Sequence, residues 1–235
     1  MDITQLIELD KQLLLALNGS ESVFLDGLVK TLTTATTWIP LYASLLYLVI
    51  KNNDSWPKVV FIVGLALACV FLAGSLDDMI VKPLVARWRP THDGEIGLLV
   101  DTVNGYRGGR FGFFSAHASN TFSLALFFVL LVRSRVLSLT LITWSLTNCW
   151  TRLYLGVHFP SDILVGLLWG SIVATTVWYV HHRLSRKIST DRGRAFISSQ
   201  YTSTGYQKAD VNVVACVFLF TIIYAVLRAC FYISV

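Results

Sequence analysis

The sequence has 235 residues, of which 54% are hydrophobic and only 14% are charged, and its formal net charge is +5. A soluble domain carries about a quarter charged residues, so this composition excludes an ordinary soluble protein. Apolar runs of about 20 residues, without the alternation of a barrel strand, indicate helices that cross a membrane. We therefore expect an all-α integral membrane protein with a single membrane-embedded domain over residues 1–235.

The first 18 residues, MDITQLIELDKQLLLALN, are too short and too charged to span a bilayer. Their leucines and isoleucines can share one helical face, and the acidic start does not resemble a secretory signal. We expect an amphipathic helix in the membrane interface, within an interfacial segment over residues 1–30.

Six apolar runs follow and predict a bundle of six transmembrane helices. The expected spans are 32–50, 59–80, 115–132, 136–154, 161–180 and 211–232. A polar, glycine-rich loop over residues 91–113 separates the second span from the third, and a basic loop over residues 181–210 separates the fifth from the sixth.

The GGRFG run of the 91–113 loop matches neither the Walker nor the dinucleotide-binding pattern. We interpret it as a flexible loop, in which Arg107 and Arg110 could contact a lipid head group.

Ionisable residues gather where the fourth apolar run ends and the fifth begins. Such groups are costly at membrane depth and usually mark function. His158 and Asp162 are four residues apart, so the carboxylate can reach the imidazole and leave its other nitrogen free as a base or nucleophile. Arg152 offers a planar fork suited to phosphate.

Two further stretches lie at span ends on the same side. Lys82 and Arg89 are seven residues apart, which places both on one face of an unbroken helix, although Pro83 distorts its start. Ser115 is a predicted N-cap, and a helix N-terminus attracts phosphate; His117 follows it.

Asp77 and Asp78 close the second predicted span. Adjacent helical residues do not face the same way, so these two carboxylates make a poor metal site. We expect Asp78 to pair with Lys82, four residues further on.

In chain order, the motifs are Lys-x6-Arg-Pro, Ser-Ala-His and Thr-Arg-x5-His-x3-Asp. They resemble the type 2 phosphatidic acid phosphatase family of integral membrane lipid phosphatases, over residues 82–162. The family usually has Pro-Ser-Gly-His where this chain has Phe-Ser-Ala-His, and serine where it has Thr151. The resemblance implies that His158 attacks phosphorus, oriented by Asp162, and that His117 protonates the leaving group and then activates water. It also implies that Lys82, Arg89, Ser115 and Arg152 hold the phosphate.

We therefore expect a metal-independent hydrolase of a membrane lipid phosphate or pyrophosphate, without a cofactor, a nucleic acid or an obligate protein partner. No His, Cys and carboxylate residues are spaced as metal ligands. The compact plan resembles bacterial polyprenyl pyrophosphate phosphatases, which favours undecaprenyl pyrophosphate. Phosphatidylglycerophosphate, phosphatidic acid and lipid A phosphate stay open as substrates.

A non-enzymatic alternative is a transporter that guides a lipid or an anion with the same basic residues. The His158–Asp162 pair and the second histidine favour an enzyme over a transporter, because transport of a lipid or an anion needs no nucleophile.

Six spans place all seven candidate residues on one membrane face. The opposite face carries ten basic residues, whereas the site face carries nine, of which three are assigned to phosphate, leaving six. The positive-inside rule therefore predicts an inner (plasma) membrane protein whose active site faces the periplasm or the outside.

Overall fold

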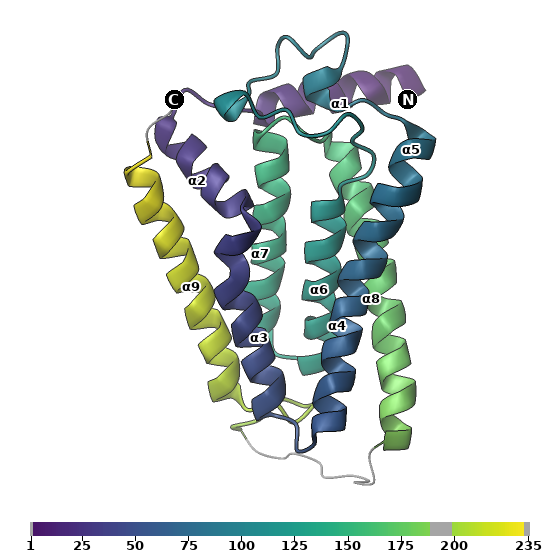
Figure 1. Cartoon of the computed structure of the whole chain (residues 1–235), viewed down its shortest axis with the longest axis vertical. Helices are drawn as coiled ribbons and strands as arrows, with labels where there is room; N and C mark the ends of the chain where they lie inside the picture. The colour runs from purple at the N-terminus through teal and green to yellow at the C-terminus, as the bar shows by residue number, and fades with distance from the viewer. Residues whose placement is uncertain (1, 189–198, 233–235) are drawn as a thin grey trace.

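The computed structural model describes residues 2–188 and 199–232. Long helices run along one axis, and a shorter N-terminal helix lies across one end of the bundle (Figure 1). The helices are α1 (Ile3–Leu17), α2 (Val23–Thr33), α3 (Ile39–Lys51), α4 (Trp56–Leu76), α5 (Lys82–Val85), α6 (Ala116–Val132), α7 (Arg135–Tyr154), α8 (Pro160–Ile188) and α9 (Lys208–Cys230). The expected all-α architecture is confirmed.

The N-terminal helix α1 starts with a capping box. Asp2 is its N-cap, and the Gln5 side chain accepts a hydrogen bond from the Asp2 backbone N–H. Of the helix residues, only Asp10 and Leu14 are buried, so one narrow face of α1 packs against the protein. The predicted amphipathic helix is present, and its place in the membrane interface stays a prediction.

The expected span over residues 32–50 is instead a bent pair of helices. A short 3-10 helix, Ala35–Trp38, follows α2, and the combined pair bends by 68°. Side chains satisfy the carbonyl groups that the break exposes: Trp38 Nε1 donates to Leu32 O at 2.8 Å, and Thr37 Oγ1 donates to Thr31 O at 2.7 Å. Pro40 lies in the first turn of α3, where its missing N–H costs nothing.

Three helical segments in the described part of the chain are long and apolar enough to cross a membrane. They are Trp56–Val85, Pro160–Ser185 and Lys208–Cys230, and the bent pair of α2 and α3 makes a fourth candidate. Helix α6 is apolar but shorter, and α6 and α7 run alongside the longer helices (Figure 1). The protein is thus a multi-pass membrane protein, and the count of six spans stays a prediction.

The second predicted span continues beyond residue 80. Helix α4 passes into a π-helical turn, Asp77–Val81, and then into α5, which ends where Ala86 adopts a left-handed conformation. The helix therefore stops before Arg89, so the expectation of Lys82 and Arg89 on one helical face is wrong. Arg89 lies in the extended segment that follows α5.

Helices α6 and α8 approach each other closely because of two glycines. A Cβ atom on Gly166 would lie 2.8 Å from Ser115 O, and one on Gly170 would lie 2.7 Å from Ser119 O. Small residues four apart allow such close backbone approach between membrane helices. The contact fixes the start of α6 against α8, where candidate site residues lie.

Helix α8 is longer than the expected span over residues 161–180. It continues to Ile188, so His181 and His182 lie on a helix and not in a loop. Residues 189–198 of the predicted 181–210 loop lie outside the described residues. Its end forms a tight turn, in which Thr202 N donates to Tyr206 O at 2.8 Å before α9 begins.

Candidate active site

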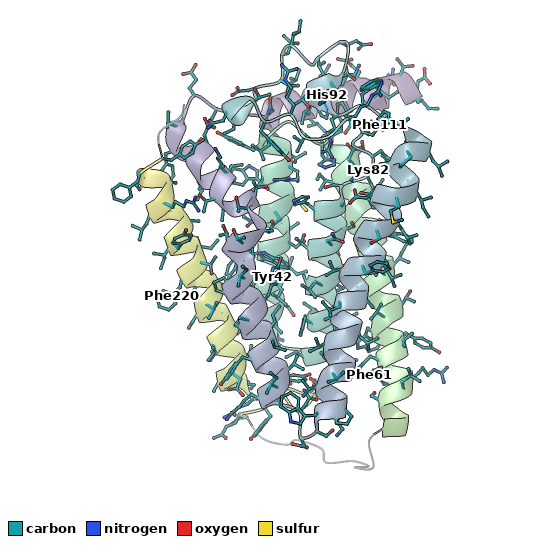
Figure 2. All side chains as sticks on the ribbon, in the orientation of Figure 1. Tyr42, Phe61, Lys82, His92, Phe111 and Phe220 are labelled. Atoms are coloured by element: carbon teal, nitrogen blue, oxygen red, sulfur yellow. The ribbon has the colours of Figure 1, made fainter. Side chains whose placement is uncertain are left out.

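The three polar stretches meet at the end of the bundle that α1 crosses. Figure 2 shows Lys82 close to this end, together with His92 and Phe111 of the loops above it. Arg89 Nη1 lies 3.0 Å from His158 Nε2, which joins the first stretch to the third. Ser115 N donates to Asp162 O at 3.1 Å, which joins the second stretch to the third. The predicted convergence at one end of the molecule is therefore present.

His158 lies in the short turn between α7 and α8. Gly156 has a φ of +64°, and a Cβ there would lie 2.2 Å from Val100 Cγ1, so only glycine fits this turn. The turn buries His158, which is only 2% exposed. Burial lowers the pKa of His158 well below its ordinary value, and the nearby charges of Arg89, Lys82 and Arg152 lower it further. The imidazole is therefore neutral at neutral pH.

Asp162 does not form the direct hydrogen bond to His158 that the spacing predicts. Its Oδ2 atom lies 3.7 Å from His158 Nδ1, beyond hydrogen-bond range, and accepts from Phe159 N at 2.9 Å instead. Through this bond the carboxylate caps the start of α8, because Asp162 in the first turn accepts from the N–H of the preceding Phe159. It remains close enough to stabilise positive charge on the ring electrostatically.

Arg87 holds the other oxygen of Asp162, with Nη1 2.7 Å from Oδ1. The motif spacing does not reveal this arginine. The segment around it is extended, because Gly112 N donates to Arg87 O and Arg89 N donates to Arg110 O. Residues two apart in an extended segment face the same side, so Arg87 and Arg89 both turn toward the site.

The glycine-rich loop is paired with this extended segment. Trp88 forms an isolated antiparallel bridge with Phe111, and a Cβ on Gly112 would lie 3.1 Å from Arg89 Cγ. Arg110 stacks over the Trp88 ring at 4.7 Å, on the outer side of the pair. Arg107 uses its backbone carbonyl to accept from Thr91 Oγ1. The loop thus lies against the extended segment that carries Arg87 and Arg89 and helps to enclose the site.

Lys82 contacts two carboxylates and not one. Nζ lies 2.8 Å from Asp77 Oδ2 and also pairs with Asp78. The π-helical turn explains the difference from the expected single pair, because it brings residues five apart together. Asp77 is fully buried, and its Oδ1 accepts from Phe114 N at 3.1 Å, so it ties the Lys82 turn to the Ser115 stretch.

Arg152 and Ser115 lie deep in the site. Arg152 is 3% exposed and donates from Nε to Thr151 Oγ1 at 3.4 Å. Ser115 is fully buried, and its hydroxyl accepts from Ala118 N as the N-cap of α6. Its capping role is therefore present, whereas hydroxyl contact with phosphate stays a prediction.

Two buried guanidinium nitrogen atoms of the site, Arg89 Nε and Arg152 Nη2, have no hydrogen-bond partner in the described part of the chain. A buried donor without a partner is costly, so such a group of donors is typical of a site that binds a ligand rich in oxygen acceptors. Residues 2–188 and 199–232 contain no group of three or more His, Cys, Asp or Glu residues that could hold a metal ion.

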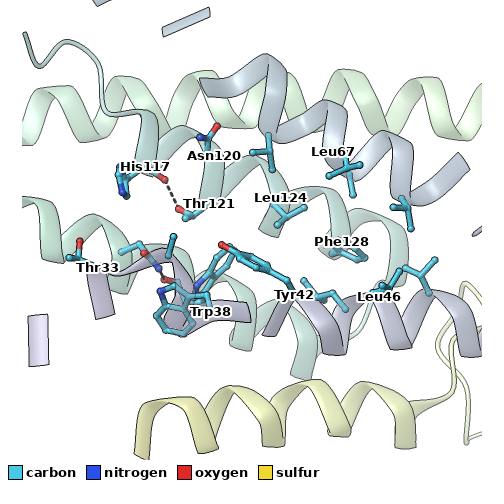
Figure 3. A pocket seen from close by; sticks show the side chains of 18 residues that line it. Thr33, Trp38, Tyr42, Leu46, Leu67, His117, Asn120, Thr121, Leu124 and Phe128 are labelled. Atoms are coloured by element: carbon cyan, nitrogen blue, oxygen red, sulfur yellow. Dashed lines mark hydrogen bonds between the residues drawn. The ribbon is translucent and has the colours of Figure 1, made fainter. Parts of the chain in front are cut away.

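A cavity of about 530 Å³ begins beside His117 and runs between α3, α4, α6 and α7. Figure 3 shows His117, Asn120 and Thr121 at its polar end, and Leu46, Leu67 and Phe128 at its apolar end. His117 is exposed to this space, in contrast to the buried His158. The lining does not include His158 or Arg89, so the cavity meets the site on the His117 side only.

The sequence matches the family model described as the PAP2 superfamily over residues 56–186. This chain belongs to the PAP2 superfamily. The matched region contains every motif residue and the contacts between them described above.

The comparison with curated proteins agrees with this membership. The chain is 40% identical over 187 residues to the lipid A 4'-phosphatase of Bacteroides thetaiotaomicron, covering 79% of this chain and 83% of that protein. It is 35% identical over 178 residues to the lipid A 4'-phosphatase of Porphyromonas gingivalis, covering 75% of this chain and 74% of that protein. The protein is therefore a membrane lipid phosphatase of the PAP2 superfamily.

A solved structure shares the fold. The transmembrane PAP2-type phosphatidylglycerolphosphate phosphatase from Bacillus subtilis superimposes with a TM-score of 0.57 at 18% identity, covering 80% of this chain and 90% of that one. At this identity the likeness concerns the fold alone. It supports the arrangement of a PAP2 helical bundle in the membrane.

Proposed function

We propose that this PAP2 phosphatase hydrolyses a phosphate monoester of a lipid A-type glycolipid through a phosphohistidine on His158. Two relatives, each matched over 74% or more of its length, are lipid A 4'-phosphatases. These relatives favour lipid A as the substrate. The sequence pattern alone favours undecaprenyl pyrophosphate. Undecaprenyl pyrophosphate thus becomes a comparison substrate.

The observation that carries the proposed chemistry is the buried, neutral imidazole of His158 among arginine nitrogens that lack partners. A neutral imidazole has the lone pair that a nucleophile requires. The guanidinium groups of Arg89 and Arg152 supply planar donors that match the geometry of a phosphoryl group. Nucleophile and oxygen-binding donors therefore lie in one small volume.

In the first step, His158 Nε2 forms a bond to phosphorus while the bond from phosphorus to the leaving oxygen breaks. His117 gives its proton to that oxygen, so the lipid departs as an alcohol. The negative charge of Asp162, 3.7 Å from Nδ1, stabilises the positive charge that develops on the ring.

In the second step, His117 takes a proton from water as the water oxygen attacks phosphorus. The bond between phosphorus and Nε2 breaks, and the imidazole returns to its neutral form. Arg89, Arg152 and the free N–H groups at the start of α6 stabilise the phosphoryl oxygens in both steps. Apart from the attacking water, the scheme uses only side chains and backbone groups of the chain.

The cavity beside His117 suits the hydrocarbon part of the substrate. Its lining changes from polar side chains near His117 to leucine, valine and aromatic side chains along the helices. A lipid could thus keep its chains in an apolar environment while its phosphate reaches the buried basic residues. We propose that the enzyme acts at the outer face of the inner membrane, as the charge asymmetry of the sequence predicts.

The direct test is phosphate release by the purified full-length protein in detergent. The substrates are bis-phosphorylated lipid A, undecaprenyl pyrophosphate, phosphatidylglycerophosphate and phosphatidic acid, and His158→Ala is the matched inactive variant. We expect the highest kcat/KM on lipid A, with mass spectrometry showing loss of the 4'-phosphate. A higher kcat/KM on undecaprenyl pyrophosphate would refute the substrate, and activity retained by His158→Ala would refute the nucleophile.

A further inference from the structure

The N-terminal helix α1 contacts the first turn of α8 through one buried carboxylate. Asp10 is 9% exposed, although its helix is mostly exposed. Oδ1 accepts from Ser161 N at 2.9 Å, and Oδ2 accepts from Ser161 Oγ at 2.5 Å. These bonds join α1 to the residue directly before Asp162.

Arg87 connects the same carboxylate to Asp162. Its Nη2 atom lies 2.7 Å from Asp10 Oδ2, and its Nη1 atom lies 2.7 Å from Asp162 Oδ1. The guanidinium also stacks over the Phe159 ring at 4.2 Å. A planar group with donors on two edges is suited to bridge two carboxylates in this way, which a lysine is not.

The bridge determines where the Asp162 carboxylate lies. Oδ1 is held by Arg87, and Oδ2 is held by Phe159 N, which leaves Asp162 no freedom to turn relative to His158. Removal of either partner from a buried ion pair leaves an uncompensated charge. A change at Asp10 would therefore be transmitted through Arg87 and Ser161 to the turn that carries His158.

We propose that Asp10 and Arg87 are positioning residues of the phosphatase, so that α1 completes the active site from outside the family motifs. The proposal rests on the proposed function, because it assigns to Asp162 and His158 the roles given above. Neither Asp10 nor Arg87 touches the reacting atoms. They act by holding the Phe159–Asp162 turn in place.

The chain offers a matched control on the same helix. Lys11, next to Asp10, pairs with Glu95 of the 91–113 loop. This ion pair also fastens α1 to the protein, and the bond to Glu95 raises the pKa of Lys11. It makes no contact with Asp162, so Lys11→Gln weakens the attachment of α1 without disturbing the bridge.

The test compares Asp10→Asn with Lys11→Gln in the full-length protein. We expect Asp10→Asn to lower kcat by about tenfold to a hundredfold and to move the acid limb of the pH–rate profile. The titratable and charged groups around Asp162 are Asp10, Arg87, Arg89 and the neutral His158, and Asp10→Asn changes the charge balance among them. A loss of folded protein would scale the whole profile and leave its shape unchanged. Lys11→Gln should match the wild type in rate and profile.

A second measurement does not depend on turnover. Diethyl pyrocarbonate modifies accessible histidines, and His158 is only 2% exposed. We expect Asp10→Asn to raise its modification several-fold, measured by mass spectrometry, and Lys11→Gln to leave it unchanged. Equal modification and equal profiles in both variants would overturn the proposal. A wild type inactive on every lipid would refute the proposed function alone, because the labelling still decides the positioning role.

Discussion

The Nη1 atom of Arg89 lies 3.0 Å from Nε2 of His158. A guanidinium can only donate, so Nε2 is the acceptor and the proton of the neutral ring is on Nδ1. The lone pair proposed to attack phosphorus is thus engaged by the arginine proposed to bind the phosphate. A phosphoryl group that draws Arg89 to its oxygens would release the nucleophile at the same time.

Replacing Arg89 should therefore affect both binding and chemistry. We expect Arg89→Ala to lower kcat/KM by about a hundredfold to a thousandfold, because one donor to the transition state is lost. Arg110→Ala is the matched control, since Arg110 stacks on the outer side of the same paired segment. Steady-state kinetics on the best lipid substrate measure both variants. Equal losses in the two would contradict a specific role for Arg89.

The pH dependence should follow the lowered pKa of His158. Only the neutral imidazole attacks, and burial and the neighbouring cations keep it neutral below its ordinary pKa of about 6.5. In the pH profile of kcat/KM, the acid limb due to His158 should therefore lie well below pH 6.5. Activity should be lost as the pH falls through the lowered pKa of His158. In Arg89→Ala the limb should move to higher pH, because a neighbouring cation has gone. A wild-type limb centred at pH 6.5 would be inconsistent with a buried nucleophile.

Hydrolysis should not require a divalent metal ion. The proposed steps use His158, His117 and arginine donors, and we expect full activity after incubation with EDTA and removal of the chelator complex. Vanadate should inhibit as a phosphate mimic held by the same basic groups. Activity lost in EDTA and restored by magnesium or manganese would disprove this prediction.

The orientation of the site can be tested with exposed positions at the two ends. Leu98, 98% exposed, lies in the loop above the site, and Ser203 is exposed in the turn before α9 at the other end. In a background lacking the exposed Cys216 and Cys230, Leu98→Cys should react with a membrane-impermeant thiol reagent in intact spheroplasts. Ser203→Cys should react only after lysis. The reverse pattern would place the phosphatase site on the cytoplasmic face.

The close contact of α6 and α8 predicts a sharp difference between glycines. Gly170→Ala would place a methyl group 2.7 Å from Ser119 O, so we expect a loss of about 1–3 kcal/mol in stability. Gly64→Ala is the control, because a Cβ there has no atom within 4 Å. Thermal unfolding in detergent compares the two. Similar melting temperatures would indicate that the helices separate to admit the methyl group.

The convergence of the motif residues could be predicted from the sequence, because each motif stands at the end of an apolar run. Regular helical geometry then brings the ends of neighbouring helices together. The partners of these residues could not be predicted in the same way. Asp77 forms an ion pair with Lys82 because the helix adopts a π-helical turn there. No residue pattern in the sequence predicts that turn.

Arg87 illustrates a second limit. Its side chain reaches Asp162 because residues 87–89 are extended and paired with the glycine-rich loop. The sequence alone continues the helical spacing from Lys82, which would direct Arg87 and Arg89 to different sides. Likewise, the polar Thr36 and Thr37 give no clear sign of the 68° bend, which depends on tertiary hydrogen bonds to the end of α2.

The glycine contact between α6 and α8 also has a mechanical consequence. His117 stands on one of these helices and Asp162 on the other, and main-chain atoms set the gap between them. The distance between α6 and α8 at the site is therefore fixed by backbone contact. Lys82 is attached to the same helices, because buried Asp77 pairs with it and also accepts from Phe114 N, next to the start of α6. A phosphate would therefore meet His117 and Asp162 at a spacing that the backbone contact between α6 and α8 already sets.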